Sequence, residues 1–356
     1  MLPILIEGRG GGVRQVKSEC LLPVFKKGGN MGYPDIRLRR LRKNAEIRNL
    51  VKENFLSISN FMYPVFLIDG KDKKESVKTM PGVYRFSLDL LLKEIKEAED
   101  LGIKSILLFG VSEKKYSDKD IDKSYLKDNF ITEAIKEIKS KFPKMVLAVD
   151  VCLCGFTQSG HCGLIKNKTI DNDLSLKAIA KTALSYAKAG ADIVAPSAMM
   201  DGMVGSIRKE LDENDFKDTL IMSYSAKYAS SFYGPFRDIA DSAPSFGDRK
   251  TYQMPSPNSR EAMREIELDI EEGADIVMIK PALSYLDIIC KARERFDLPI
   301  AAYSVSGEYS MVKFAANSGA LDEKRAILEI MESIKRAGAN IIITYFAKEM
   351  GRLLNE

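Results

Sequence analysis

Three cysteines lie close together in the chain, at Cys152, Cys154 and Cys162. Cys152 and Cys154 would share one face of a strand end, and the loop that follows can return Cys162 to meet them. Thiolates are soft ligands that favour zinc, and a set of three leaves one tetrahedral position open for water or substrate. The spacing therefore predicts a catalytic zinc site. The alternative is a group of buried, reduced cysteines without a metal.

The chain contains a single histidine, His161, directly beside the third cysteine. Any mechanism that needs a histidine base or nucleophile elsewhere is therefore excluded. Ligation by His161 and Cys162 together would be sterically awkward, so we expect His161 to structure the loop or support a ligand. It is not counted among the zinc ligands.

Two lysines follow apolar runs, Lys227 after Leu220–Ala226 and Lys280 after Asp275–Ile279. Burial and a neighbouring ammonium both disfavour the charged form, so each amine would become free to attack a ketone. This pattern indicates Schiff-base chemistry. The alternative for either lysine alone is a side chain that snorkels at a strand end.

A long segment rich in glycine and proline, residues 230–257, separates these lysines. It exceeds the usual loop length, which is typical of an active-site lid. Arginines within it, Arg237 and Arg249, would suit a carboxylate substrate, with Tyr252 and Gln253 as further donors. Ordinary surface charges are the alternative.

Eight short apolar runs alternate with segments of helical period from residue 61 onward, as in repeated βα units. Eight units favour a (β/α)8 TIM barrel over an open doubly wound sheet, with active residues at the strand C-terminal ends. The runs are Phe61–Ile68, Lys104–Gly110, Met145–Leu153, Asp192–Pro196, Thr219–Ser225, Asp275–Lys280, Pro299–Val305 and Asn340–Phe346.

Related junctions precede three of these runs, each with a glycine that suits a helix C-terminus: Gly190, Gly273 and Gly338. Segments ahead of such junctions carry apolar residues at three- and four-residue spacing, which predicts amphipathic helices. Clear examples are Leu88–Leu101, Leu174–Ala189 and Arg260–Glu272.

The charge balance, the apolar runs and the cysteine content argue against several classes of protein. The 54 basic and 50 acidic residues nearly cancel, so the chain shows no general signal for binding nucleic acid. The apolar runs are too short to span a membrane, and five cysteines, three of them clustered, fit a reduced cytoplasmic protein better than a disulfide framework. Residues 1–32 lack a secretory pattern and stay unassigned, with an organellar targeting role left open.

Residues 33–60 carry no strand pattern but contain the run Arg37, Arg39, Arg40 and Arg42. A basic run is often only solvated, yet a polar segment attached to a barrel often docks on another subunit, where arginines pair with carboxylates. We therefore expect an N-terminal arm ahead of the barrel, which would occupy residues 61–356.

Taken in order, these features resemble the porphobilinogen synthase family, also called 5-aminolevulinate dehydratase, from about residue 33 to the C-terminus. The shared phrases include Met-Pro-Gly-Val-Tyr-Arg from Met80, Ser-Tyr-Ser-Ala-Lys-Tyr-Ala-Ser from Ser223, Gly-Asp-Arg-Lys-Thr-Tyr-Gln-Met from Gly247 and Met-Ile-Lys-Pro-Ala from Met278. The resemblance implies that two molecules of 5-aminolevulinate condense through lysine Schiff bases to form porphobilinogen.

The resemblance also implies roles for individual residues. Lys280 would hold the substrate that becomes the propionate side of the product, at the P site, and Lys227 would hold the second substrate, at the A site. The remaining assignments are Ser306 and Tyr345 for the P-site carboxylate, Arg237, Arg249 and Gln253 for the A-site substrate, and Asp150, Ser197 and Asp201 for amine binding and proton transfer.

The three cysteines match the zinc-dependent branch of the family, whereas the other branch replaces them mainly with aspartate. Residues 155–160 depart from the usual family pattern and lose a histidine near the metal, which leaves zinc affinity less certain. Glu265 matches a position that binds an additional magnesium in some members. Family members form octamers through N-terminal arms, which predicts a homo-octamer here.

Two other functions are compatible with these residues when the family resemblance is set aside. A class I aldolase also uses a barrel lysine, but it needs neither three clustered cysteines nor a second active lysine. A zinc-structured scaffold would keep the cysteines without turnover.

Overall fold

The computed structural model describes residues 32, 35–112, 115–117, 120–121 and 129–355. It contains two compact units, Met1–Glu53 and Asn54–Glu356. The predicted unassigned segment 1–32 lies outside the described residues except for Gly32.

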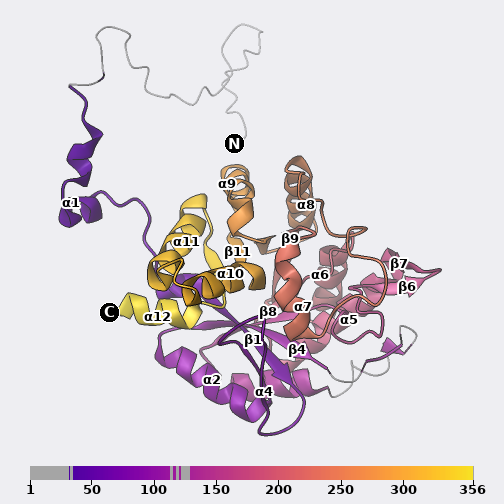
Figure 1. The fold of residues 1–356 in the computed structure, drawn as a ribbon. Helices are drawn as coiled ribbons and strands as arrows, with labels where there is room; N and C mark the ends of the chain where they lie inside the picture. Colours follow the sequence, from indigo (N-terminus) through magenta and orange to yellow (C-terminus); the bar gives the residue numbers. More distant parts are fainter. Residues whose placement is uncertain (1–31, 33–34, 113–114, 118–119, 122–128, 356) are drawn as a thin grey trace, which may run out of the picture. The chain divides into compact units, whose positions relative to one another are not determined.

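Eight parallel strands form a closed barrel in the second unit (Figure 1). Strand β12 pairs with β1, so the eight parallel strands form a closed ring. This closure confirms the predicted (β/α)8 barrel and excludes the open doubly wound alternative. The barrel strands are β1 Phe61–Ile68, β4 Ser105–Val111, β5 Val146–Val151, β8 Ile193–Pro196, β9 Leu220–Lys227, β10 Ile276–Lys280, β11 Ile300–Ser304 and β12 Ile341–Thr344.

Helices follow the strands and cover the outside of the barrel (Figure 1). Their buried faces carry residues such as Leu91 and Ile95 of α2 and Ile327 and Met331 of α11, at the spacing expected for amphipathic helices. The helices of this unit are α2 Leu88–Asp100, α4 Phe130–Lys141, α5 Asn172–Ala189, α6 Met203–Glu213, α7 Gly234–Ala240, α8 Arg260–Glu271, α9 Leu286–Arg295, α10 Ser306–Asn317, α11 Glu323–Ala337 and α12 Ala347–Asn355, with short 3-10 turns η2 Ile58–Asn60, η3 Ser231–Tyr233 and η4 Leu283–Tyr285.

The predicted strands agree with the observed ones to within three residues at each end. The glycine junctions are also as expected, since Gly190 and Gly273 adopt φ values of 108° and 102°. The residue two positions after each glycine has a further role that the pattern did not reveal. Its side-chain oxygen accepts the backbone N–H of the first or second residue of the preceding barrel strand.

Two small hairpins lie outside the barrel strands and were not predicted. Strands β2 Lys74–Ser76 and β3 Tyr84–Phe86 form one hairpin, and β3 pairs in parallel with the C-terminal half of β1. Strands β6 Leu164–Lys166 and β7 Thr169–Asp171 form the other, directly after the cysteine loop. Both lie next to loops at the C-terminal ends of barrel strands.

The described part of the first unit contains a 3-10 turn, η1 Leu38–Arg42, and a short helix, α1 Ala45–Leu50. Neither element has a buried residue. Apolar side chains are among the exposed ones, with Leu38 at 65% and Leu50 at 84%. The assignment of residues 33–60 as an arm for subunit contacts stays a prediction.

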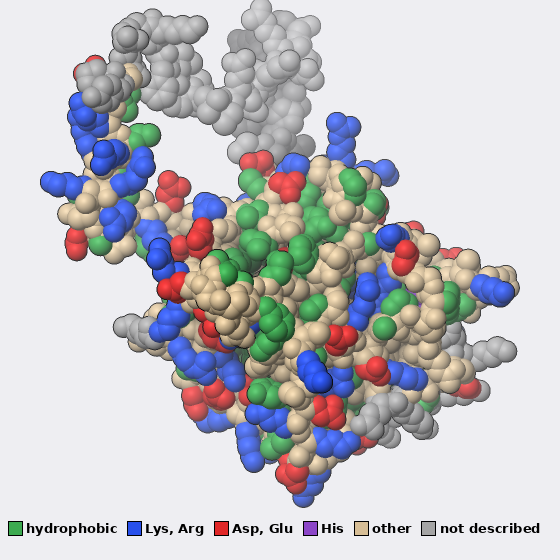
Figure 2. All heavy atoms as spheres, in the orientation of Figure 1, with side chains coloured by type: hydrophobic (Ala, Val, Ile, Leu, Met, Phe, Trp, Pro, Cys, Tyr) green, Lys and Arg blue, Asp and Glu red, His purple; other side chains and the backbone are tan. Residues whose placement is uncertain are grey.

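No helix among the described residues is long and apolar enough to cross a membrane. Figure 2 shows acidic and basic side chains interspersed over the drawn face of the barrel unit.

The junction oxygens provide a test of barrel stability. Asp275 Oδ2 accepts the N–H of Ile221 at 2.7 Å, and Asn340 does the same for Ile300 with an amide oxygen. We expect Asp275→Ala to lower the free energy of unfolding by about 1–2 kcal/mol, because the Ile221 N–H loses its acceptor. Asp275→Asn should stay close to wild type, and denaturant-unfolding midpoints distinguish the two variants. Equal losses in both would contradict this role.

Candidate active site

The two predicted lysines lie side by side at the C-terminal end of the barrel. Lys227 ends β9 and Lys280 ends β10, and the two are direct partners in the parallel register. Their side chains are almost completely buried, with exposures of 5% and 4%. The structure thus brings together the two amines that the sequence placed on neighbouring strands.

Aromatic rings surround the amine of Lys280. Its Nζ lies 4.3 Å from the ring centroid of Tyr303, 4.8 Å from Phe236 and 4.9 Å from Tyr224, with Tyr233 at 5.3 Å. Burial in this cage, reinforced by the charge of Lys227, lowers the pKa of Lys280 to about 7. The amine is therefore largely neutral just above neutral pH and able to act as a nucleophile.

Lys227 is held against the neighbouring strands. Its Nζ donates a short hydrogen bond to the carbonyl oxygen of Ser197, which follows β8. Asp150, near the end of β5, faces both lysines: desolvation raises the pKa of its carboxyl group, and the charges of Lys227 and Lys280 oppose that shift. The site thus contains a carboxyl group beside two amines, which is suited to moving protons.

The three predicted cysteines converge at the end of β5. Their Sγ atoms all lie within 4.8 Å of one another, and all three side chains are buried. Zinc–sulfur bonds are about 2.3 Å long, so one zinc ion can reach all three atoms. They form the only such potential metal-binding set among the described residues. The donor set therefore fits zinc.

His161 does not complete this set. Its Nδ1 lies 3.0 Å from the hydroxyl of Tyr252, and its Nε2 lies 3.0 Å from the carbonyl oxygen of Phe246. Both ring nitrogens thus connect the cysteine loop to the segment after α7. This geometry agrees with the expectation that His161 structures the loop.

The predicted lid, residues 230–257, contains η3 and α7. It carries several buried polar atoms without a hydrogen-bond partner among the described residues: Nε of Arg237, Nε of Arg249 and Nε2 of Gln253. Unsatisfied buried donors are costly, so such atoms point to a bound ligand. A carboxylate is a suitable acceptor for donors of this kind.

Arg249 also connects two loops. Its Nη2 donates to the carbonyl oxygen of Gly160 in the cysteine loop at 2.9 Å and to that of Ser242 at 2.5 Å. The guanidinium group therefore has one side engaged with the protein and the Nε atom still unpaired.

Ser306 and Tyr345 follow β11 and β12, the two strands that come after the Lys280 strand β10 around the barrel. Ser306 Oγ accepts the N–H of Phe236 at 2.9 Å and lies 3.2 Å from the carbonyl oxygen of Phe232. The next residue, Gly307, permits this approach, because a Cβ atom there would meet the Phe232 carbonyl oxygen at 2.6 Å. The Tyr345 hydroxyl lies 3.0 Å from that of Tyr303, beside the Lys280 cage.

Glu308 was missed by the sequence analysis. It is 1% exposed, and its carboxylate accepts N–H groups of Leu283, in the loop after Lys280, and of Val305, before Ser306. Burial raises its pKa to about 7 despite these hydrogen bonds. No motif signalled this contact, because it depends on two loops that meet only in the fold.

Asp201 and Glu265 line an outer pocket of about 780 Å³, together with Gln253 and Asp269, and neither Lys227 nor Lys280 is among the residues that line it. Burial, followed by the charges of Asp269 and Asp201, raises the pKa of Glu265 to about 7. Glu265 belongs to no set of three close ligand atoms among the described residues.

A small cavity lies on the cysteine side of the site. It has a volume of about 20 Å³ and lies among Asp150, Cys152, Cys154, Phe236 and Ser242. Such a volume holds about one water molecule. Any larger ligand in this cavity would require movement of its wall, to which the predicted lid contributes Phe236 and Ser242.

Residues 35–353 match the family model described as delta-aminolevulinic acid dehydratase. Relatives of that name include proteins from Methanothermus sociabilis, 55% identical, and Synechococcus elongatus, 52% identical. Each alignment covers 90% of this chain and 99% of the relative.

A solved structure is also similar: delta-aminolevulinic acid dehydratase (porphobilinogen synthase) from Toxoplasma gondii ME49, in complex with its reaction product porphobilinogen. It is 45% identical, with a TM-score of 0.86 over 89% of this chain and 91% of that one. With its lysine pair and cysteine cluster on a closed barrel, this chain belongs to the delta-aminolevulinic acid dehydratase family.

Proposed function

We propose that this chain is a porphobilinogen synthase, which condenses two molecules of 5-aminolevulinate to porphobilinogen with release of two molecules of water. The observation that carries the proposal is the pair of buried lysines, Lys227 and Lys280, in direct register beside three clustered cysteines. Family membership supports this activity over an aldolase or a scaffold.

Lys280 would act first as a nucleophile. Its neutral amine adds to the ketone of the P-site substrate, and loss of water from the adduct gives an imine. The aromatic cage favours this step, because it keeps water and charge away from the amine. Ser306 and Tyr345, at the same end of the barrel, would hold the carboxylate of this substrate.

Lys227 would hold the A-site substrate in the same way. The Ser197 carbonyl oxygen fixes the direction of its amine, and Asp150 can exchange protons with both amines. The carboxylate of this substrate would bind Arg237, Arg249 and Gln253, whose unpaired buried donors support the assignment. Asp201 is exposed in the outer pocket, where it would meet the amine of an entering substrate.

Cys152, Cys154 and Cys162 would hold the zinc ion, which polarises the A-site substrate when bound. Magnesium remains a proposal that rests on Glu265, in the acidic wall of the outer pocket. Mg²⁺ keeps most of its water ligands, so one or two carboxylates can be enough.

We also propose a homo-octamer in which residues 33–60 act as the subunit-contact arm. The exposed apolar side chains in this segment support it, because contact with a second copy would bury them. The clustered unpaired thiols favour a reducing, cytoplasmic location.

The activity is tested by incubating zinc-loaded protein with 5-aminolevulinate and measuring porphobilinogen. We expect Lys280→Met to lose turnover by about a thousandfold or more, because no other residue supplies its imine. Lys291→Met, which removes an exposed lysine from α9, is the matched control and should keep wild-type turnover. Absence of product from the wild-type protein would refute the proposed activity.

The pH dependence of imine formation follows from the lowered pKa of Lys280. With a pKa of about 7, the amine is about nine-tenths neutral at pH 8, whereas an ordinary lysine is under a hundredth neutral. Borohydride trapping of 4-oxopentanoate on the Lys280 peptide should therefore rise with pH, with a midpoint near 7, and then level off. A midpoint near 10 would show that the amine is not perturbed.

The cysteine site is tested by metal content rather than by activity. We expect Cys162→Ser to lower bound zinc to a small fraction of about one ion per chain, because a tetrahedral site loses one of its three protein ligands. Cys290→Ser, on the exposed face of α9, is the control and should bind zinc normally. Cobalt substitution gives a second readout, since the thiolate charge-transfer band should weaken in Cys162→Ser only.

A further inference from the structure

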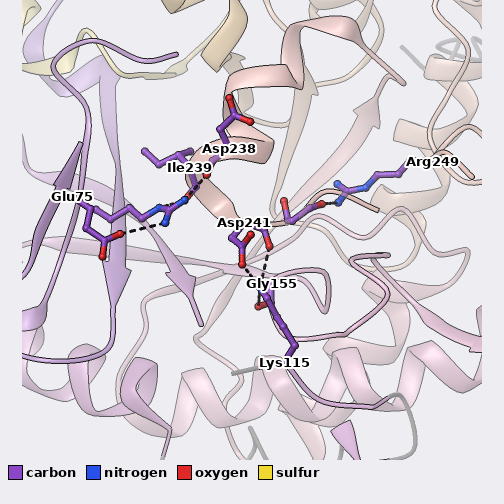
Figure 3. Close-up of polar contacts among 9 residues, drawn as sticks. Glu75, Lys115, Gly155, Asp238, Ile239, Asp241 and Arg249 are labelled. Carbon is purple, nitrogen blue, oxygen red and sulfur yellow. Dashed lines mark hydrogen bonds and ion pairs between the residues drawn. The ribbon is translucent and has the colours of Figure 1, made fainter. Parts of the chain in front are cut away.

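Three basic side chains from separate elements converge on the C-terminal end of α7 and the residues that follow it. They are Arg85 of β3, Lys115 after β4 and Arg249 of the lid. In Figure 3, Glu75 and Ile239 lie to one side, Lys115 and Asp241 lie in the middle, and Arg249 lies to the other side. Only Arg249 has a role in the proposed reaction.

Arg85 makes the most extensive of these contacts. Its Nε donates to the carbonyl oxygen of Ile239 at 2.6 Å, and its Nη2 donates a short hydrogen bond to that of Asp238. Its Nη1 lies 3.3 Å from Glu75 Oε2, on the neighbouring strand β2. A planar fork can make these contacts together, whereas a single ammonium cannot.

Lys115 holds Asp241, the residue that follows α7. Its Nζ donates to the carbonyl oxygens of Asp241 and Gly155, each at 2.9 Å. Gly155 belongs to the cysteine loop, so this amine ties the lid to the segment that bears the metal ligands. The last carbonyl groups of a helix have no partner within the helix, and these cations supply the missing donors.

The segment held in this way carries residues of the reaction. Phe236 packs against Lys280, and Arg237 presents its unpaired Nε. The N-terminal end of α7 is fixed separately, through the Phe236 N–H and Ser306. The position of α7 therefore decides whether Phe236 and Arg237 are in place for the reaction.

We propose that Arg85, assisted by Lys115, is a positioning residue that holds α7 and Arg237 over the two lysines in the closed state. The inference rests on the proposed function. Arg85 touches no reacting atom, and it acts by setting the fraction of molecules in which the A-site carboxylate donors are in place. A smaller closed fraction weakens the apparent affinity for substrate in proportion.

The test uses Arg85→Met, which keeps the aliphatic stem and removes the fork, and Arg85→Lys, which restores one donor. We expect Arg85→Met to raise KM for 5-aminolevulinate at least about tenfold, with a smaller effect on kcat, and Arg85→Lys to recover part of that loss. Glu75→Gln is the matched control: it weakens the ion pair with Arg85 but leaves the α7 contacts, so its KM should stay within about twofold of wild type.

Hydrogen exchange distinguishes positioning from general destabilisation. In Arg85→Met, amides of residues 234–242 should exchange faster while those of β9 and β10 keep wild-type protection. Unchanged KM and unchanged exchange at 234–242 in the folded variant would overturn the proposal. If Arg85→Met does not fold, Lys115→Met provides the same test from the neighbouring contact. Wild-type porphobilinogen formation, measured in parallel, keeps this result separate from the proposed function itself.

Discussion

The burial of an amine beside a second amine is the constraint on which this site depends. A lysine without water is strongly disfavoured as a cation, and the adjacent Lys227 increases that penalty for Lys280. The barrel makes this arrangement possible because register pairing places the two side chains on neighbouring strand ends. Burial of this lysine lowers the stability of the folded chain, but it provides a neutral amine near physiological pH. Such perturbed groups are common at functional sites.

The remaining groups at the barrel mouth follow from that arrangement. The aromatic rings around Lys280 exclude water from its amine, which favours the neutral form. Carboxyl groups are placed where they can take up or release the protons involved, as with Asp150, or are fully used by backbone donors, as with Glu308. The loops that bear these residues are held mainly by hydrogen bonds to main-chain carbonyl and N–H groups.

Much of the barrel could be predicted because its signals are local. Strand runs, glycine junctions and amphipathic spacing each depend on a few consecutive residues, and they gave the strands to within three residues. The lysine pair and the cysteine cluster were also recognisable, because unusual residue types stood at predicted strand ends. Their chemistry followed from the residue types, whereas the division of the lysines between the P and A sites came from the family resemblance.

Other features could not be predicted, because they depend on distant segments that meet only in the folded chain. Glu308 joins the loop after Lys280 to the start of α10, and Arg85 reaches α7 from a hairpin that carries no strong strand pattern. The position of Asp201 in the outer pocket likewise follows from the path of the chain after β8.

Arg249 connects three parts of the site in one guanidinium group. One nitrogen donates to Gly160 in the cysteine loop and to Ser242 beyond α7, while Nε has no partner among the described residues. With Arg249 in its proposed role, substrate binding, lid position and the order of the cysteine loop would be thermodynamically linked through this side chain, and the linkage would act equally in each direction. A chain that keeps its cysteine loop in order would then also hold its lid, and the proposed substrate, more firmly.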